Sequence, residues 1–297
     1  MGNSRPRRAL VLCGGASRGA VEVGFVKALG ELGIEFDLIV GTSIGALNGA
    51  MLATGMGIDE IEEFWSHFNR WKAVRLNWGW LIRPRMQPGL FSLDPMRRVL
   101  RDLLPVTRFE DLEVPLWVTT TELNNGSAVY WGERGNVIEP VVASMSIPGI
   151  FPPVILDGQL HVDGGIANNV PLDFAARQGA CELYLIDCFC DGPCLRPPRG
   201  LVQVLMRSFS TAVGEKYEAD RAHFRDRMKI VRVRPKFDNN IDLLDFSKSL
   251  EFIQAGYEAT LAAMEAAQNE IAAECCNGQV GCSQVTVEGP DGDAVTS

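Results

Sequence analysis

Two short apolar runs near the start of the chain, each followed by a helical pattern, restrict the fold more than any other feature. Residues 9–13 form a continuous apolar run that ends in two glycines, and apolar side chains then recur at helical spacing as far as Gly33. Residues 37–40 form a second run, which the small apolar segment 41–55 follows. Continuous apolar runs are typical of strands buried on both faces. Because strands that alternate with helices form parallel sheets, we expect a three-layer α/β/α fold with a mainly parallel central sheet.

The alternation continues nearly to the C-terminus. Four more strands are predicted at residues 116–121, 127–131, 182–188 and 229–233, and a closing amphipathic helix is predicted at 246–273. We expect one domain over residues 1–275. Residues 276–297 are rich in small polar side chains and have little to bury, so we expect a disordered tail there.

Composition excludes several classes of protein. The net charge of -9 and the pI near 5.0 argue against nucleic-acid binding. Neither a signal peptide nor a transmembrane segment is predicted, so we expect a cytoplasmic protein, peripheral on membranes if it contacts them. The eight cysteines have no paired CxxC spacing, so we expect free thiols and no metal site.

The pentapeptide from Gly41 to Gly45, GTSIG, lies between the second strand and its helix. In that context a GxSxG sequence indicates a nucleophile elbow, in which a strained turn exposes the central serine above the sheet. The start of the following helix favours a developing alkoxide on Ser43. A helix N-cap in a glycine-rich turn is the alternative explanation of Ser43.

The loop GGASRG, residues 14–19, opens the first helix and so carries unpaired backbone amides that could bind an oxyanion. It lacks the lysine of a P-loop, and no acidic residue follows the second strand as a dinucleotide site requires. A plain tight turn remains an alternative. Since the carboxyl ends of parallel strands share one edge, we expect the loop beside Ser43.

A serine nucleophile needs a base, and none of the three histidines lies in a persuasive loop. His67 and His223 lie in helix-like segments of mixed polarity, and His161 lies in a short strand. Asp163, in HVDGGIANNVP, is the better candidate because it ends that strand. An ordinary Asp-Gly turn is the alternative.

These motifs together resemble the patatin-like phospholipases. GGASRG is similar to the family's oxyanion loop, GTSIG to its elbow, SMSIPGIFPP to its characteristic loop, and DGGIANNVP to the segment with its catalytic aspartate. The resemblance implies a Ser-Asp dyad, with Ser43 as nucleophile and Asp163 as base. It implies an oxyanion hole formed by the loop whose residues are Gly14, Gly15, Ala16, Arg18 and Gly19. It covers residues 10–171, and it leaves the role of Arg18 open between helix packing and contact with lipid phosphate.

Residues 65–101 form a basic and aromatic segment within this acidic chain. Eight Lys and Arg residues face a single acid there, which gives 8 minus 1, or +7, and four tryptophans are interspersed. Such a mixture suits anionic lipid headgroups. We expect a lid or membrane-facing cap, with lipid-facing candidates at Trp78, Trp80, Arg83 and Arg85. Core tryptophans and a solvated arginine face are the alternative.

The predicted function is that of a serine hydrolase that cleaves acyl esters of phospholipids or lysophospholipids without a cofactor. Two rivals are an α/β-hydrolase with a Ser43, Asp163 and His223 triad, and a non-catalytic lipid-binding module. The sequence leaves open the headgroup, the acyl chain, glycerides as substrates and the oligomeric state.

Overall fold

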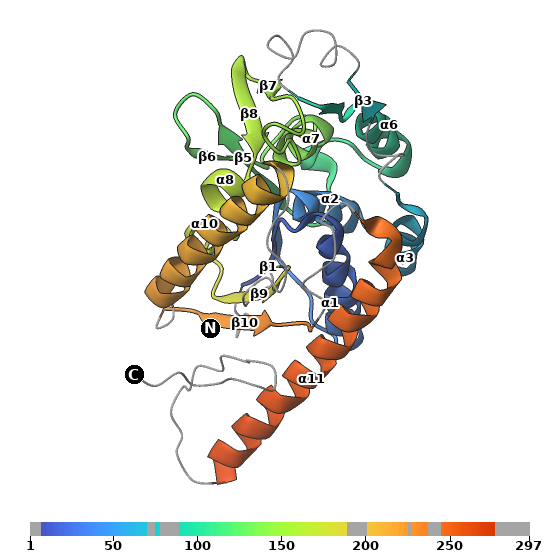
Figure 1. Ribbon diagram of the computed structural model, residues 1–297. Coiled ribbons are helices and arrows are strands. Elements are labelled where there is room, and N and C mark those ends of the chain that lie inside the picture. Colours follow the sequence, from blue (N-terminus) through green and yellow to red (C-terminus); the bar gives the residue numbers. More distant parts are fainter. Residues whose placement is uncertain are drawn as a thin grey trace.

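The computed structural model of this chain has a central sheet with helices on both faces (Figure 1). The structure describes residues 7–69, 75–77, 89–188, 201–224, 227–236 and 245–276. Within these ranges the sheet has eight strands, in the order β10-β9-β1-β2-β5-β8-β7, with β6 paired to β5. The predicted three-layer α/β/α fold with a mainly parallel sheet is therefore confirmed.

Five neighbouring strands of this sheet are parallel. They are β10 (Lys229–Val233), β9 (Glu182–Ile186), β1 (Arg8–Leu12), β2 (Leu38–Thr42) and β5 (Leu116–Glu122). Every residue of β2 is buried, and so are four of the five residues of β1, as their continuous apolar sequences predict. The other four predicted strands, at 116–121, 127–131, 182–188 and 229–233, all form.

The remaining strands are antiparallel. They are β6 (Ala128–Trp131), β7 (Val154–Leu156) and β8 (Gln159–Asp163), while β3 (Arg75–Leu76) and β4 (Phe91–Ser92) form a separate small sheet. The short strand expected to contain His161 and end at Asp163 forms as β8, but its hairpin partner β7 was not predicted. The turn between them is Asp157-Gly158, and both residues have positive φ, 47° and 79°, as a tight type I′ hairpin turn requires.

Helices flank the sheet on two sides. On one face lie α1 (Ala20–Glu31), α2 (Ile44–Ala53), α3 (Ile58–His67), α6 (Asp94–Leu103), α7 (Ile138–Ser144) and α11 (Ser249–Cys276). On the other lie α8 (Gly165–Asn168), α9 (Leu172–Arg177) and α10 (Leu201–Phe224). The short 3₁₀ turns are η1 (Ala16–Gly19), η2 (Phe109–Asp111) and η3 (Phe246–Lys248).

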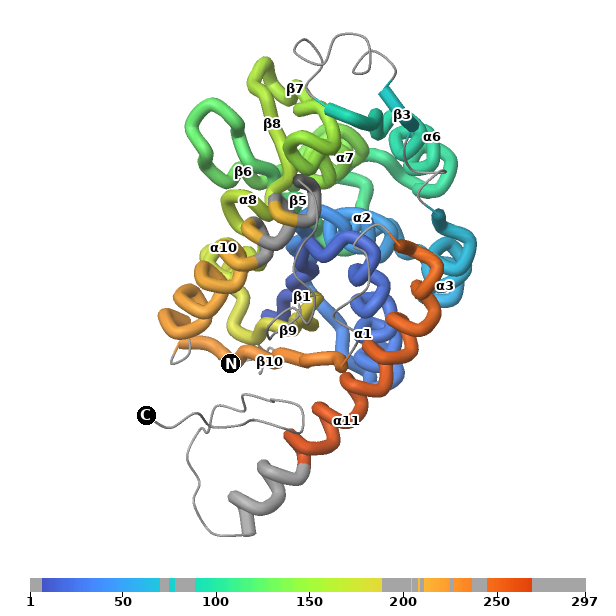
Figure 2. Tube along the Cα trace, in the orientation of Figure 1, coloured from blue at the N-terminus to red at the C-terminus, as the bar shows by residue number. Residues whose placement is uncertain are grey.

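The C-terminal helix packs on the N-terminal helix. Figure 2 shows α11, in orange and red, alongside α1, in blue, and the helices lie so close that a Cβ at Gly24 would be 1.8 Å from the carbonyl oxygen of Ile253. The predicted closing helix thus forms, and its α-helical part extends from Ser249 to Cys276. The predicted tail from residue 277 onward lies outside the described residues. No helix in the described ranges combines the length and apolar character needed to cross a bilayer.

Two strands that run in opposite directions meet on one edge of β5. There β2 pairs with residues 116–119 of β5, and β8 pairs with residues 120–122. Because β6 pairs with residues 118–121, it occupies the other edge, so β2 and β8 share an edge. The parallel β2 and the antiparallel β8 approach each other along this edge. Their C-terminal residues therefore meet beside Thr119 and Thr120, which brings Ser43 close to Asp163.

Candidate active site

Ser43 lies at a strained turn between β2 and α2. Its backbone has φ 54° and ψ -122°, a region that is costly for a residue with a side chain. A Cβ at Gly45 would lie 2.4 Å from the carbonyl oxygen of Leu12, so only glycine permits this close approach of the turn to the end of β1. The local geometry is that of a nucleophile elbow.

The expectation that Ser43 is exposed above the sheet is wrong. The residue is only 8% exposed. The loop that follows β1 lies against it, because a Cβ at Gly14 would be 2.9 Å from the Cβ of Ser43. The hydroxyl group of Ser43 is therefore enclosed. Any side chain that bonds to this hydroxyl is shielded from water as well.

Ser43 Oγ donates a hydrogen bond of 2.7 Å to Oδ2 of Asp163. The other carboxylate oxygen, Oδ1, accepts a 2.8 Å hydrogen bond from the backbone N–H of Gly165 at the start of α8. Asp163 is 2% exposed. Burial outweighs the two hydrogen bonds and raises the pKa of Asp163 to about 7. A carboxylate with that pKa is a stronger base near neutral pH than an exposed aspartate is.

None of the three histidines lies between these two groups. His161 is buried in β8, where its Nδ1 contacts Thr120 Oγ1 at 3.0 Å and burial lowers its pKa. The exposed His67 contacts the carbonyl oxygen of Glu63, and the exposed His223 contacts Arg227. Since Asp163 bonds Ser43 directly, no imidazole is interposed as the rival triad requires.

The loop after β1 is held in place by Asn169, for which the sequence suggested no role. Its Oδ1 accepts a 3.1 Å hydrogen bond from the N–H of Gly14, and its Nδ2 donates a 3.2 Å bond to the carbonyl oxygen of Gly14. The asparagine side chain thus mimics a neighbouring strand. It ties the loop to the segment that follows Asp163.

Only part of the predicted oxyanion hole has free donors. The N–H of Gly14 is engaged by Asn169, and the N–H of Arg18 donates to the carbonyl oxygen of Gly15 at 3.2 Å. Gly19 ends η1 and lies against Ile44. For the N–H groups of Gly15 and Ala16 the described part of the chain provides no acceptor. These two amides are therefore candidates for the oxyanion hole.

A buried network of hydrogen bonds lies beside the loop. Glu22 Oε2 accepts a 2.8 Å hydrogen bond from Asn48 Nδ2, and Asn48 Oδ1 accepts one of 2.9 Å from Trp65 Nε1. Cys188 Sγ contacts Glu22 Oε1 at 3.5 Å. In the described ranges Cys13, Glu22 and Cys188 are the one group close enough to bind a metal, with donor atoms within 4.8 Å. Hydrogen bonds within the protein already satisfy the Glu22 carboxyl group.

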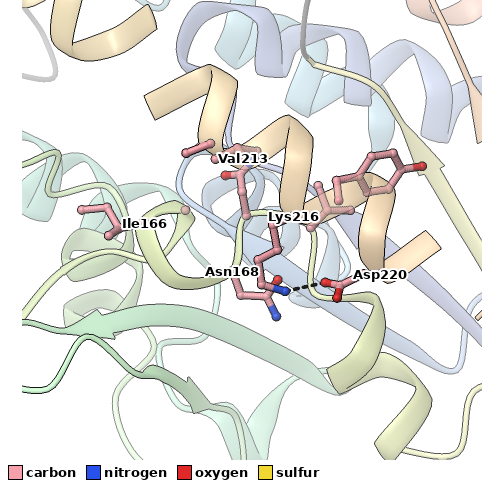
Figure 3. A pocket seen from close by; sticks show the side chains of 10 residues that line it. Ile166, Asn168, Val213, Lys216 and Asp220 are labelled. Carbon is pink, nitrogen blue, oxygen red and sulfur yellow. Dashed lines mark hydrogen bonds and ion pairs between the residues drawn. The ribbon is translucent and has the colours of Figure 1, made fainter. Parts of the chain in front are cut away.

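A pocket adjoins the candidate site between the α8 segment and α10 (Figure 3). Its apolar lining includes Ile166, Val170, Ala212 and Val213. On its polar side, Lys216 and Asp220 form an ion pair, drawn as a dashed line. The pocket also touches Gly165, the residue whose amide binds Asp163, whereas Ser43 and Asp163 themselves do not line it.

Comparison with known proteins shows to which family the chain belongs. Residues 10–176, more than half of the chain, match the family described as patatin-like phospholipase. The chain belongs to the patatin-like phospholipase family. The family resemblance expected from the four motifs is therefore confirmed.

Two relatives of this patatin-like chain are much larger proteins. Neuropathy target esterase sws of Drosophila melanogaster is 32% identical over 182 residues, which are 60% of this chain and 12% of that protein. Patatin-like phospholipase domain-containing protein 7 of Rattus norvegicus is 35% identical over 183 residues, 60% of this chain and 13% of that protein. An uncharacterized NTE family protein of Mycobacterium tuberculosis is 32% identical over 172 residues, which are 58% of this chain and 46% of that protein. The chain thus spans less than half of each relative.

The lipid-facing candidates of this patatin-like chain are only partly described. Trp78, Trp80, Arg83 and Arg85 lie outside the described residues. At the start of the basic segment Trp65 is fully buried in the core, so this tryptophan does not face lipid. Near its end Arg97 pairs with Glu139 at 3.0 Å and with Asp94. Part of the segment's charge is thereby neutralised within the fold.

Two polar residues at the site had no predicted role, Asn169 and Ser144. Both lie inside motifs that carried the family resemblance, DGGIANNVP and SMSIPGIFPP, and that is the signal that could have singled them out. Ser144 Oγ accepts a 2.7 Å hydrogen bond from the N–H of Ser43. Spacing alone does not reveal this contact, because 101 residues separate the partners.

Proposed function

We propose that this chain is a serine carboxylic-ester hydrolase that cleaves acyl ester bonds of phospholipids or lysophospholipids, with Ser43 as nucleophile and Asp163 as general base. The observation that carries the proposal is the 2.7 Å hydrogen bond between Ser43 Oγ and Asp163 Oδ2, both buried. Family membership supports the lipid substrate class. The names of relatives, an esterase and phospholipase-domain proteins, agree with ester hydrolysis.

The first half-reaction acylates the serine. Asp163 takes the proton of Ser43 as Oγ attacks the ester carbonyl carbon, and the backbone N–H groups of Gly15 and Ala16 stabilise the oxyanion. The C–O bond to the alcohol then breaks, and the proton on Asp163 passes to the departing alkoxide. The alcohol leaves, and the acyl group stays on Ser43.

The second half-reaction frees the enzyme. Asp163 takes a proton from water as the water oxygen attacks the acyl-enzyme carbonyl. The tetrahedral intermediate collapses, the proton returns to Ser43 Oγ, and the fatty acid leaves. Asp163 can serve in both halves because burial raises its pKa to about 7, so the group is ionised in a large fraction of molecules near neutral pH and still accepts a proton readily.

We place the lipid at the apolar pocket beside α10 and at a membrane surface. Of the residues that line this pocket, Ile166, Val170, Ala212 and Val213 are the apolar ones that would contact an acyl chain. Trp78, Trp80, Arg83 and Arg85 stay candidates for contact with anionic headgroups. The chain would then act as a peripheral protein that takes its substrate from the bilayer.

The proposal is tested by assaying the purified chain on a panel that contains a lysophospholipid, a diacyl phospholipid and a triglyceride. We expect fatty acid release from one or both phospholipid classes, and none from the Ser43→Ala variant. Binding of these lipids without any release by the wild type would favour the non-catalytic lipid-binding alternative. Retained release by Ser43→Ala would remove Ser43 as nucleophile.

A further inference from the structure

The hydrogen-bond ladder between β2 and β5 stops at the candidate nucleophile. In this ladder Ile39 N–H donates to the carbonyl oxygen of Pro115 at 2.9 Å. Bonds donated by one parallel strand recur at every second residue. The same register, in which Thr42 pairs with Thr119, would next join the N–H of Ser43 to the carbonyl oxygen of Thr119.

A hydroxyl group is inserted at that position. The N–H of Ser43 donates to Ser144 Oγ at 2.7 Å, and the hydroxyl of Ser144 donates to the carbonyl oxygen of Thr119 at 2.6 Å. Two hydrogen bonds in series hold two backbones further apart than one direct bond does. Ser144 therefore continues the ladder through its side chain and separates the elbow from β5.

The segment that carries this hydroxyl also holds the base. The N–H of Asp163 donates to the carbonyl oxygen of Ser146 at 2.9 Å, and the N–H of Gly164 donates to that of Ser144 at 3.4 Å. Residues 144–146 thus contact both the turn that presents Ser43 Oγ and the strand end that presents the carboxylate. Ser144 is fully buried, so no solvent competes for its hydroxyl.

We propose that Ser144 is a positioning residue, whose hydroxyl wedge between Ser43 and Thr119 holds the strained elbow so that Ser43 Oγ points at Asp163. The inference rests on the proposed function for its effect on rate. Ser144 touches neither reacting atom, and it acts through the backbone of Ser43. Without the hydroxyl, the elbow can move toward β5 and draw Oγ away from the carboxylate.

Ser146 provides a matched control two residues away. It is equally buried, and its hydroxyl donates to the carbonyl oxygen of Val142 at 2.8 Å, within the end of α7. Its link to Asp163 uses its backbone oxygen, which Ser146→Ala retains. Comparison of Ser144→Ala with Ser146→Ala therefore separates loss of the wedge from loss of a buried hydroxyl.

The test measures three properties of the wild type, Ser144→Ala, Ser144→Thr and Ser146→Ala: thermal unfolding, kcat and KM on the preferred lipid, and the rate of inactivation by a fluorophosphonate. We expect Ser144→Ala to unfold close to Ser146→Ala, with kcat and inactivation rate lowered on the order of 100-fold and KM little changed. Ser144→Thr, which keeps the hydroxyl, should recover about tenfold over alanine. A Ser144→Ala kcat within about twofold of Ser146→Ala overturns the proposal.

A structure of Ser144→Ala keeps the inference separate from the proposed function. We expect the N–H of Ser43 to shift toward the carbonyl oxygen of Thr119, and the Ser43–Asp163 hydrogen bond to lengthen or break. An unchanged Ser43 backbone and an unchanged contact overturn the positioning role, whatever the activity. If the Ser144→Ala variant does not fold, the Ser144→Cys variant replaces it. A thiol forms weaker hydrogen bonds than a hydroxyl, so Ser144→Cys should lower kcat. An unchanged kcat overturns the proposal. A wild type that releases no fatty acid and is not labelled contradicts the proposed function alone.

Discussion

Thr42 and Asp163 end two strands that run toward each other along one edge of β5, where Thr42 pairs with Thr119 and Asp163 pairs with Thr120. Ser43 follows Thr42 directly, so its hydroxyl meets the carboxylate across this junction. The distance between nucleophile and base is therefore set by strand register. A shift of β8 by one residue would turn Asp163 to the opposite face of the sheet.

The pKa of Asp163 predicts how activity depends on pH. Burial raises it from the ordinary 3.8 to about 7, and the base must be ionised to take the proton of Ser43. We expect kcat/KM to rise with pH, about tenfold per unit below the pKa, and to level off above about pH 7. Asp163→Asn should lower kcat by about 100- to 10,000-fold. A profile that is flat from pH 5 to 9 would show that no carboxyl group with a raised pKa acts as base.

Glu22 predicts a second pH dependence, in stability. Burial raises its pKa from 4.5 to about 8, so between these values the folded chain keeps a proton that the unfolded chain releases. The free energy of unfolding should therefore fall as pH rises through this window, by about 1.4 kcal/mol for each unit of pKa difference at most. Asp163 contributes in the same direction.

The Glu22→Gln variant isolates that contribution. Its amide cannot ionise, so its unfolding free energy in urea should fall less steeply than that of the wild type between pH 5 and 8. Glu35→Gln serves as the control, since Glu35 is exposed and its replacement should leave the wild-type slope intact. Equal slopes for Glu22→Gln and the wild type would contradict the raised pKa.

The pocket beside α10 predicts a chain-length preference. Val213 lines the pocket and is 6% exposed, so Val213→Trp should fill it. If the acyl chain lies there, displacing two methylenes costs about 1.6 kcal/mol, or roughly 15-fold in kcat/KM for long-chain esters. Short-chain esters should be little affected. Val204→Trp on the exposed side of the same helix is the control, and equal losses for both chain lengths would place the acyl chain elsewhere.

The basic and aromatic segment predicts binding to anionic membranes. Arg83→Glu with Arg85→Glu should weaken flotation with phosphatidylserine vesicles by at least about 30-fold, because each basic residue near the surface contributes about 1 kcal/mol. A double reversal at the exposed Arg134 and Arg227 changes the net charge equally and should bind like the wild type. Unchanged flotation of the Arg83 and Arg85 variant would remove the lipid-facing assignment.

Much of the fold could be predicted because its signals are local. The apolar runs at β1 and β2 and the helical pattern that ends at Gly33 each depend on neighbouring residues, and their elements formed within about two residues of prediction. The β7–β8 hairpin was missed although Asp157-Gly158 is a tight-turn sequence. The strand that became β8 was expected, but its partner β7 is only three residues long, too short for periodicity to show.

The parts of the site that sequence could not supply depend on long-range contacts. Asn169 occupies the amide of Gly14, and so removes one predicted oxyanion donor, across a separation of 155 residues. Trp65 resembled a lipid-facing aromatic in its basic surroundings, yet its indole N–H donates to Asn48 within the core. Which side of a helix faces the core follows from tertiary packing, and composition does not report it.

The central claim is that Ser43 is a nucleophile activated by Asp163, and reaction with a fluorophosphonate followed by peptide mass spectrometry tests it most directly. We predict one adduct, on Ser43, in the wild type, none in Ser43→Ala, and labelling at least about 100-fold slower in Asp163→Asn. An adduct on another residue, or labelling of Asp163→Asn at the wild-type rate, would contradict the account.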